Sequence, residues 1–249
     1  MTERFVRHKK SLLHYKMLGS ADRTLFIFHG FGQDHQAFQS ISDTLSAHYT
    51  LFVFDLYFHG KSEWGYDEMP LEKEHWKETI RHLLEEYHIE KFALAGFSLG
   101  GKFALATAEL FPSQTEAIFL LAPDGIKTSF WYSLATYPIL FRKFFKSMIT
   151  HPGRLAVIIR FLESLGLMDK GLIRFVEHQM NTPEKRRRVY YSWVVFRRLV
   201  VDVKIIAGLV NHYSIPVTLI IGKYDKVIKA KNMDRLLKRL ESFRLEIVE

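Results

Sequence analysis

The stretch KFALAGFSLGGKFALATAELF, residues 91–111, decides the fold of this chain. It joins a short apolar run, Phe92 to Ala95, through a glycine-flanked serine to an apolar segment from Lys102 to Phe111 that is typical of a helix. A serine on a tight strand-to-helix turn needs glycines two residues on either side, because larger side chains would collide there. The pattern G-x-S-x-G in this setting predicts a nucleophile elbow with Ser98 at its tip. The competing interpretation is a glycine-rich turn with an incidental serine.

Other apolar runs bounded by turn residues recur along the chain. They are Leu25 to Phe28, Leu51 to Phe54, Ala117 to Leu121 and Val217 to Ile221. Because they do not alternate with polar residues, they suit strands that are covered on both faces. Helix-period segments separate them, at Trp76 to Tyr87 and at Met233 to Leu240. The last run, Phe243 to Val248, does alternate and indicates a half-exposed strand near a sheet edge. The sequence predicts an α/β fold with a mostly parallel central sheet flanked by helices.

Residues 125–210 interrupt this rhythm, since they hold helical patterns and no convincing strand. We expect a helical insertion over 125–210 in a core made of residues 1–124 and 211–249. One helix of the insertion is predicted to begin at Thr182, which caps it, with Pro183 in its first turn. The chain has 249 residues, of which 48% are hydrophobic and none is cysteine. This composition excludes a mainly disordered chain, a disulfide scaffold and a cysteine nucleophile.

The net charge of +8 is unevenly distributed along the chain. Residues 127–210 hold 15 Lys or Arg and 5 Asp or Glu, whereas the remainder holds 20 and 22. The run KRRR (185–188), with Arg197 and Arg198, favours an anionic substrate or weak contact with an anionic membrane surface. The alternative interpretation is a solvated helix face. Because no recognition motif accompanies the charge, nucleic acid is not expected as a partner.

The beginning of the chain, MTERFVRHKKSLLHYK, lacks the apolar core of a signal peptide. No window of the sequence holds the roughly 18 consecutive apolar residues that a membrane span needs. We therefore expect a cytoplasmic protein.

With these motifs in order, the sequence resembles the α/β-hydrolase family over nearly the whole chain. FIFHGFG (26–32) looks like the family's His-Gly turn, and GFSLGG (96–101) looks like its nucleophile elbow. DLYFHGKS (55–62) is similar to the family's D-x-P-G-x-G-x-S turn, with Tyr57 and Phe58 in place of proline and glycine. PVTLIIGKYDKVI (216–228) is similar to the strand and loop that deliver the catalytic acid. The helical insertion falls where the family places its lid.

This resemblance implies a role for several residues. Ser98 would be the nucleophile, and the backbone amides of Phe31 and Leu99 would form the oxyanion hole. Asp225 would orient a histidine and stabilise its imidazolium form, with Asp124 as the alternative acid. An ordinary turn aspartate is the competing interpretation of Asp225. No cofactor and no metal are implied.

The histidine of this triad is not evident in the sequence. In the family's chain order it follows the acid, yet all 12 histidines precede Asp225. His29 belongs to the His-Gly turn and is expected to be structural, while His35 and His59 are weaker candidates for the base. We expect the natural chain to continue past Glu249 with a histidine. The alternative is a hydrolase-like fold without a triad.

Aromatic side chains are frequent at the beginning of the insertion, and they predict an apolar pocket above the serine. They are Phe130, Trp131, Tyr132, Tyr137, Phe141, Phe144 and Phe145. Packing within the insertion is the competing interpretation. We expect a serine hydrolase, esterase-like, that cleaves a carboxylic ester or related acyl bond of a small hydrophobic and, given the basic insertion, anionic substrate. Carbon–carbon hydrolase or lyase chemistry at the same site, and a ligand-binding or interaction protein without catalysis, stay open as alternatives.

Overall fold

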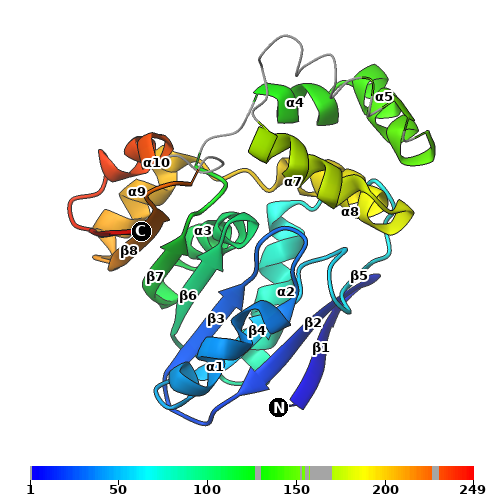
Figure 1. Ribbon diagram of the computed structural model, residues 1–249. Helices are drawn as coiled ribbons and strands as arrows, with labels where there is room; N and C mark the ends of the chain where they lie inside the picture. The colour runs from blue at the N-terminus through cyan, green and yellow to red at the C-terminus, as the bar shows by residue number, and fades with distance from the viewer. Residues whose placement is uncertain (1, 127–129, 152, 155–156, 158–169, 226–229) are drawn as a thin grey trace. The chain divides into compact units, whose positions relative to one another are not determined.

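The computed structural model describes residues 2–126, 130–151, 153–154, 157, 170–225 and 230–249 (Figure 1). One sheet forms the centre, in the order β1-β2-β4-β3-β6-β7-β8-β9, with the short β5 paired to β2. The strands are β1 (Thr2–His8), β2 (Ser11–Leu18), β3 (Thr24–Phe28), β4 (Thr50–Phe54), β5 (Glu63–Trp64), β6 (Phe92–Phe97), β7 (Thr115–Leu121), β8 (Val217–Gly222) and β9 (Arg244–Val248). All pairs from β4 to β9 are parallel, whereas β2 is antiparallel to its neighbours. The predicted α/β class with a mostly parallel sheet is confirmed.

The strands predicted from apolar runs are all present, as β3, β4, β6, β7 and β8. The alternating run near the end of the sequence forms β9, the last strand in the sheet order, as predicted. The hairpin of β1 and β2 was not predicted. Its strands pair from Thr2 with Met17 to His8 with Ser11, and they extend the sheet beyond β4 at its other end.

Helices cover both faces of the sheet (Figure 1). On one face, phenylalanines of neighbouring strands stack, Phe26 on Phe92 and Phe28 on Phe54, with ring centroids 4.7 Å and 5.1 Å apart. Trp76 of α2 (Lys73–Glu86) packs edge-on against Phe28 of this layer and against Phe103 of α3 (Leu99–Leu110). On the other face, aliphatic side chains of β3, β4 and β6 pack beneath the 3₁₀ turn His35–Phe38 and α1 (Gln39–Ser46). Burial on both faces explains why these strands read as unbroken apolar runs.

The chain divides into two compact units. Unit 1 comprises residues 1–66, 71–127 and 198–249, and unit 2 comprises residues 67–70 and 128–197. The described helices of unit 2 are α4 (Phe130–Thr136), α5 (Ile139–Thr150), α7 (Lys170–Met180) and α8 (Pro183–Val195). The Thr182 side chain accepts a hydrogen bond from the Lys185 amide at 3.2 Å, so the predicted cap of α8 is confirmed.

One helix of the expected insertion belongs to unit 1. This helix, α9 (Val203–His212), buries Ile206, Ala207 and Val210 and packs against α3 and α10 (Ala230–Leu237). The boundary between the units therefore falls at residue 197, earlier than the expected 210. Along the described part of the chain, no helix is both long and apolar enough to cross a bilayer.

Candidate active site

Ser98 lies at the turn between β6 and α3, so the predicted strand–turn–helix is present. Its backbone has φ +48° and ψ −116°, a conformation that costs a non-glycine residue on the order of 1–3 kcal/mol. Three hydrogen bonds hold this strained turn. The Ser98 amide donates to the Leu121 carbonyl at 2.9 Å, and the Ser98 carbonyl accepts from the amides of Gly101 and Asp124 at 2.9 Å and 2.8 Å. These bonds fix the backbone of Ser98, and the residue is partly exposed.

The two glycines of the motif are required by close backbone approach. A Cβ at Gly96 would lie 2.5 Å from the Gly100 carbonyl oxygen, and a Cβ at Gly100 would lie 2.0 Å from the Phe28 carbonyl oxygen. Both distances are far inside van der Waals contact, and the atoms met are backbone atoms that cannot rotate away. The spacing of glycines around Ser98 thus reflects how tightly α3 crosses the ends of β3 and β6.

The amides expected to form an oxyanion hole follow two adjacent strands. Leu99 is the first residue of α3, so its amide has no acceptor within the helix. In the turn after β3, Gly30 donates to the Gln33 side chain and Gly32 donates to His59 Nε2, at 2.9 Å and 3.1 Å. The Phe31 amide between them makes no hydrogen bond to any described residue. Phe28 pairs with Gly96 in the sheet, so both turns lie at the edge where the parallel strands end, here called the carboxyl edge.

The two candidate acids also lie at the carboxyl edge. Asp124 follows β7, is exposed, and accepts a hydrogen bond from the Gly125 amide at 2.7 Å. Asp225 follows β8, is half-buried, and donates its amide to the Gly222 carbonyl at 3.1 Å. Since β7 lies between β6 and β8, Asp124 follows the strand adjacent to that of Ser98, and Asp225 follows the next one. The assignment of Asp225 as the acid stays a prediction.

Two of the histidines considered as the base, His29 and His59, hydrogen-bond to main-chain groups of nearby turns. His29 is fully buried; its Nδ1 donates to the Gly30 carbonyl at 2.7 Å and its Nε2 accepts from the Leu56 amide at 2.9 Å. His59 likewise donates from Nδ1 to the Tyr57 carbonyl and accepts at Nε2 from Gly32. Both rings brace backbone turns, because each uses both nitrogens in hydrogen bonds to the main chain.

His35 belongs to a buried cluster with Asp55 and His14. Asp55, at the end of β4, accepts from His14 Nδ1 at 2.7 Å, from His35 Nδ1 at 2.9 Å, and from the amides of His35 and Lys61 at 2.7 Å and 2.9 Å. These donors hold the pKa of Asp55 well below its ordinary value, although burial of the carboxylate opposes the shift. His14 was not among the predicted site residues.

Histidine and carboxylate side chains are also metal ligands, and one donor atom from each of His14, His35 and Asp55 lies within 4.8 Å of the others. However, the ring nitrogens and carboxylate oxygens that meet here are engaged with one another in hydrogen bonds. The two Nε2 atoms are buried and have no hydrogen-bond partner in the described part of the chain. The cluster is therefore a hydrogen-bonded network that braces the carboxyl edge, and no metal is assigned to it.

The turn after Asp55, where the sequence departs from the pattern of the family that it resembles, contains two residues with positive φ. Phe58 has φ +68° although it is not glycine, and Gly60 has φ +50°. A Cβ at Gly60 would lie 1.8 Å from an Asp55 carboxylate oxygen, so only glycine fits there. Tyr57 is fully buried and donates to the Ser11 hydroxyl at 3.2 Å.

Lys102 is a buried amine near the elbow that the sequence analysis did not single out. It lies one helical turn after Ser98 and is 8% exposed. Gly125, with φ +96°, packs against its stem: a Cβ there would lie 3.0 Å from Lys102 Cα. Burial lowers the pKa of Lys102 to about 8, although the Asp124 charge opposes this. The available signal was a lysine within the otherwise apolar first turns of α3.

The basic and aromatic residues of the insertion have structural roles as well. Arg186 is buried and donates to the carbonyls of Ile149 and Met180, and Arg197 is buried and donates to the carbonyls of Glu68 and Val194. Arg198 is exposed and pairs with Glu72.

The aromatic residues of the insertion differ in their surroundings. The Tyr132 and Tyr137 hydroxyls donate to the carbonyls of Trp193 and Arg197, and Phe145 packs on Tyr190 and Trp193. Phe141 and Phe144 are exposed, whereas the side chains of Phe130 and Trp131 lie outside the described residues.

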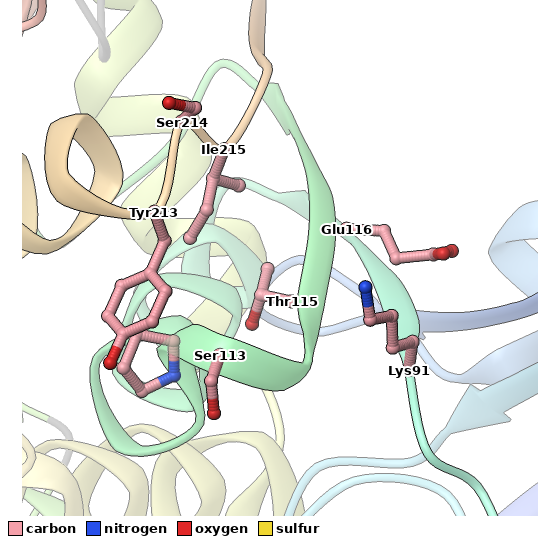
Figure 2. A pocket seen from close by; sticks show the side chains of 8 residues that line it. Lys91, Ser113, Thr115, Glu116, Tyr213, Ser214 and Ile215 are labelled. Carbon is pink, nitrogen blue, oxygen red and sulfur yellow. The ribbon is translucent and has the colours of Figure 1, made fainter.

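Figure 2 shows a cavity of about 370 Å³. Its lining comes from the segments that precede β6, β7 and β8 and from the first two residues of β7, so it lies at the amino ends of these strands, whereas Ser98 follows the carboxyl end of β6. The lining residues are Lys91, Pro112, Ser113, Thr115, Glu116, Tyr213, Ser214 and Ile215. Because the strands are parallel, the length of a strand separates this cavity from the elbow, so it is not the predicted pocket.

A second group of histidines is expected to make stability depend on pH. His75 bonds to the Ser11 hydroxyl at 2.8 Å, and its ring meets that of His8 at 4.6 Å. Burial, and then the charges of His8 and Lys9, lower the pKa of His75 to about 4. Burial, and then the charge of His82, lower the pKa of His8. Between about pH 6.5 and pH 4 the unfolded chain binds more protons than the folded one. The free energy of unfolding is therefore expected to fall by about 2 kcal/mol over this range through His75, after allowance for solvent screening.

Urea unfolding at a series of pH values measures this dependence. His75→Gln is expected to flatten the curve, and the matched variant of an exposed histidine, His212→Gln, is expected to leave it unchanged. Parallel curves for the parent protein and His75→Gln would contradict the assignment.

Comparison with known proteins places this arrangement in a family. A sequence model of the alpha/beta hydrolase fold matches residues 23–147, half of the chain. Over 108 residues the chain is 32% identical to a pimeloyl-[acyl-carrier protein] methyl ester esterase from Klebsiella pneumoniae, covering 43% of this chain and 39% of that protein. The chain spans less than half the length of four curated relatives that it matches at 30% identity or more.

Two solved structures share the fold. A thermophilic esterase from Thermogutta terrifontis superposes with a TM-score of 0.70 at 16% identity, covering 100% of this chain and 90% of that one. A 2-hydroxy-6-oxo-6-phenylhexa-2,4-dienoate hydrolase from a Rhodococcus species gives 0.67 at 18% identity, covering 99% and 90%. Taken with the parallel sheet and the strained Ser98 elbow, the matching family model shows that the chain belongs to the α/β hydrolase fold family.

Proposed function

We propose that this protein is a serine hydrolase that cleaves a carboxylic ester or related acyl bond through an acyl-enzyme. The observation that carries the proposal is the backbone of Ser98, held at φ +48° between β6 and α3. Strain of this kind persists where the surrounding structure enforces it, and it presents the hydroxyl clear of the helix that follows.

In the proposed reaction the Ser98 hydroxyl oxygen attacks the substrate carbonyl while a histidine takes its proton. The amides of Leu99 and Phe31 donate to the oxygen on which negative charge develops. The histidine then protonates the leaving alkoxide, and water hydrolyses the acyl-enzyme by the same steps. Asp225 orients the histidine, and Asp124 is the alternative acid.

The base needs a test of its own. His29 and His59 use both ring nitrogens in main-chain hydrogen bonds, His35 faces Asp55, and no histidine follows Asp225 in the sequence. Added imidazole, acting as an external base, is therefore expected to accelerate acylation of Ser98 in the 249-residue chain. An equal rate with and without imidazole would indicate that a histidine of this chain is already the base.

A fluorophosphonate probe tests the nucleophile. We expect one probe per chain by intact mass, bound at Ser98, and no labelling of Ser98→Ala. The matched control is Ser113→Ala, which removes a serine hydroxyl near the amino ends of the strands and is expected to label like the parent protein. Equal labelling of Ser98→Ala, or none of the parent protein even with imidazole, would overturn the proposal. The second outcome would favour the rival function, a ligand-binding or interaction protein without catalysis.

The substrate class rests on unit 2, proposed here as the lid, and on the relatives. Exposed aromatic side chains and an excess of basic ones favour a hydrophobic acyl group with an anionic neighbour. The name of the Klebsiella relative makes a methyl ester of a carrier-bound acyl group the first substrate to assay. The alternative proposal is hydrolysis of a carbon–carbon bond by the same residues, which the name of the Rhodococcus hydrolase suggests as a second assay. A cytoplasmic location is part of the same proposal.

A further inference from the structure

Helix α5 presents an apolar face to solvent. Ile139, Leu140, Phe141 and Phe144 are 61%, 79%, 48% and 48% exposed, and they lie within six consecutive residues. Phe145 is the one buried residue of this helix, and it packs against Tyr190 and Trp193 within unit 2. Scattered exposed apolar residues are ordinary, but a contiguous group of large ones indicates an interaction surface.

The charged side chains of α5 itself are all basic. Helix α5, with the sequence ILFRKFFKSMIT, contains Arg142, Lys143 and Lys146 and no acidic residue. Arg142 and Lys146 both pair with Glu68, whereas Lys143 is exposed and makes no ion pair among the described residues. Unit 2 as a whole holds 12 Lys or Arg and 6 Asp or Glu, a net charge of +6. The partner of this face is therefore expected to be both apolar and negatively charged.

We propose that the apolar face of α5 docks on an anionic lipid surface. Ile139, Leu140, Phe141 and Phe144 would enter the boundary between headgroups and acyl chains, while Lys143 would extend along it to lipid phosphates. A second copy of this chain fits less well, because it would bring a unit of net charge +6 against another of the same sign. The contact would be peripheral and is independent of the chemistry at Ser98.

Co-sedimentation with lipid vesicles tests this docking. The parent chain is expected to sediment with phosphatidylglycerol vesicles, to do so less at high salt, and to bind phosphatidylcholine vesicles weakly. The double variant Leu140→Ser/Phe144→Ser is expected to bind about tenfold more weakly, since it removes two large apolar side chains from the contact. Lys143→Glu is expected to lose binding chiefly at low salt.

Matched variants separate this face from general surface effects. Ile205→Ser removes an apolar side chain that is 52% exposed on α9, and Lys204→Glu reverses an exposed charge beside it. Both are expected to bind like the parent chain. If the double variant does not fold, as judged by circular dichroism, Lys143→Glu and Phe141→Ser carry the test.

Several results would overturn the proposal. The proposal would fail if the parent chain sedimented with neither phosphatidylglycerol nor phosphatidylcholine vesicles, or bound both equally. It would also fail if the α9 variants lost as much vesicle binding as the α5 variants. Sedimentation velocity would reveal self-association. If the parent chain dimerises and Leu140→Ser/Phe144→Ser does not, the face is a contact between copies of this chain and not a lipid surface.

Discussion

Replacing Gly100 by alanine is expected to destabilise the protein by on the order of 4 kcal/mol, because the new Cβ would overlap main-chain atoms. It would lie 2.0 Å from the Phe28 carbonyl oxygen, 2.5 Å from the Phe28 carbonyl carbon and 2.8 Å from the His29 carbonyl oxygen. Relief requires α3 to move away from the end of β3. Such a movement displaces Ser98, and it separates the amides of Leu99 and Phe31 as well. Any protein that still folds is therefore expected to react poorly with the fluorophosphonate probe.

The chain offers a matched control for this substitution. Gly208 lies within α9, and a Cβ built there meets no atom within 4 Å. Gly208→Ala is expected to stabilise the protein by about 0.5–1 kcal/mol, because alanine favours a helix over glycine. Urea unfolding measures the free energy of unfolding of both variants. The rate of labelling by the fluorophosphonate probe reports whether Ser98 is still placed for reaction. A Gly100→Ala protein as stable and as reactive as Gly208→Ala would show that the close approach of α3 to β3 is not a constraint.

The elbow was predictable because its cause is local. The glycines around Ser98, the apolar run before it and the helix after it all occur within residues 91–111, and each reflects the same tight crossing. The strands of the sheet interior were predictable for a similar reason. Side chains such as Phe26 and Ile27 are buried on opposite faces, so the whole run must be apolar.

The hairpin of β1 and β2 was missed because the burial of β1 is one-sided and the hairpin sequence is charged. In β1, Val6 is buried while Phe5 is 43% exposed, and Arg4 and Arg7 flank them. Helix α9 was placed with the insertion because its sequence shows an apolar stripe but not the surface that the stripe covers. Its neighbour α3 lies far from it in the sequence, and its other neighbour, α10, follows only after β8.

The buried polar network at the carboxyl edge could not be read from the sequence. His14, His35 and Asp55 come from three distant segments, and nothing local distinguishes a histidine that braces a turn from one that serves as a base. The structure separates these roles through hydrogen bonds: His29 and His59 hold main-chain groups, and His35 holds Asp55.

Asp55→Asn is the second substitution expected to have a large effect. The carboxylate is fully buried and accepts four hydrogen bonds, from His14 Nδ1, His35 Nδ1 and the amides of His35 and Lys61. An asparagine would turn one acceptor oxygen into a donor that faces other donors. Because the group is buried and its partners would be left unsatisfied, the free energy of unfolding is expected to fall by about 3–5 kcal/mol. Asp43→Asn, on the exposed surface of α1, is the matched control and is expected to change it by less than about 0.5 kcal/mol.

Asp55 also makes stability depend on pH, but over a lower pH range than His75 does. The pKa of Asp55 is lowered by folding, so its contribution to stability is complete above the pKa of the unfolded aspartate, near 3.8, and is lost as the pH falls below that value. The His75 contribution is already lost between about pH 6.5 and pH 4. Asp55→Asn is therefore expected to lower the unfolding free energy almost uniformly from neutral pH down to about pH 4, whereas His75→Gln changes the slope over that range. A loss in Asp55→Asn below about 1 kcal/mol at neutral pH would mean that the four donors find other acceptors.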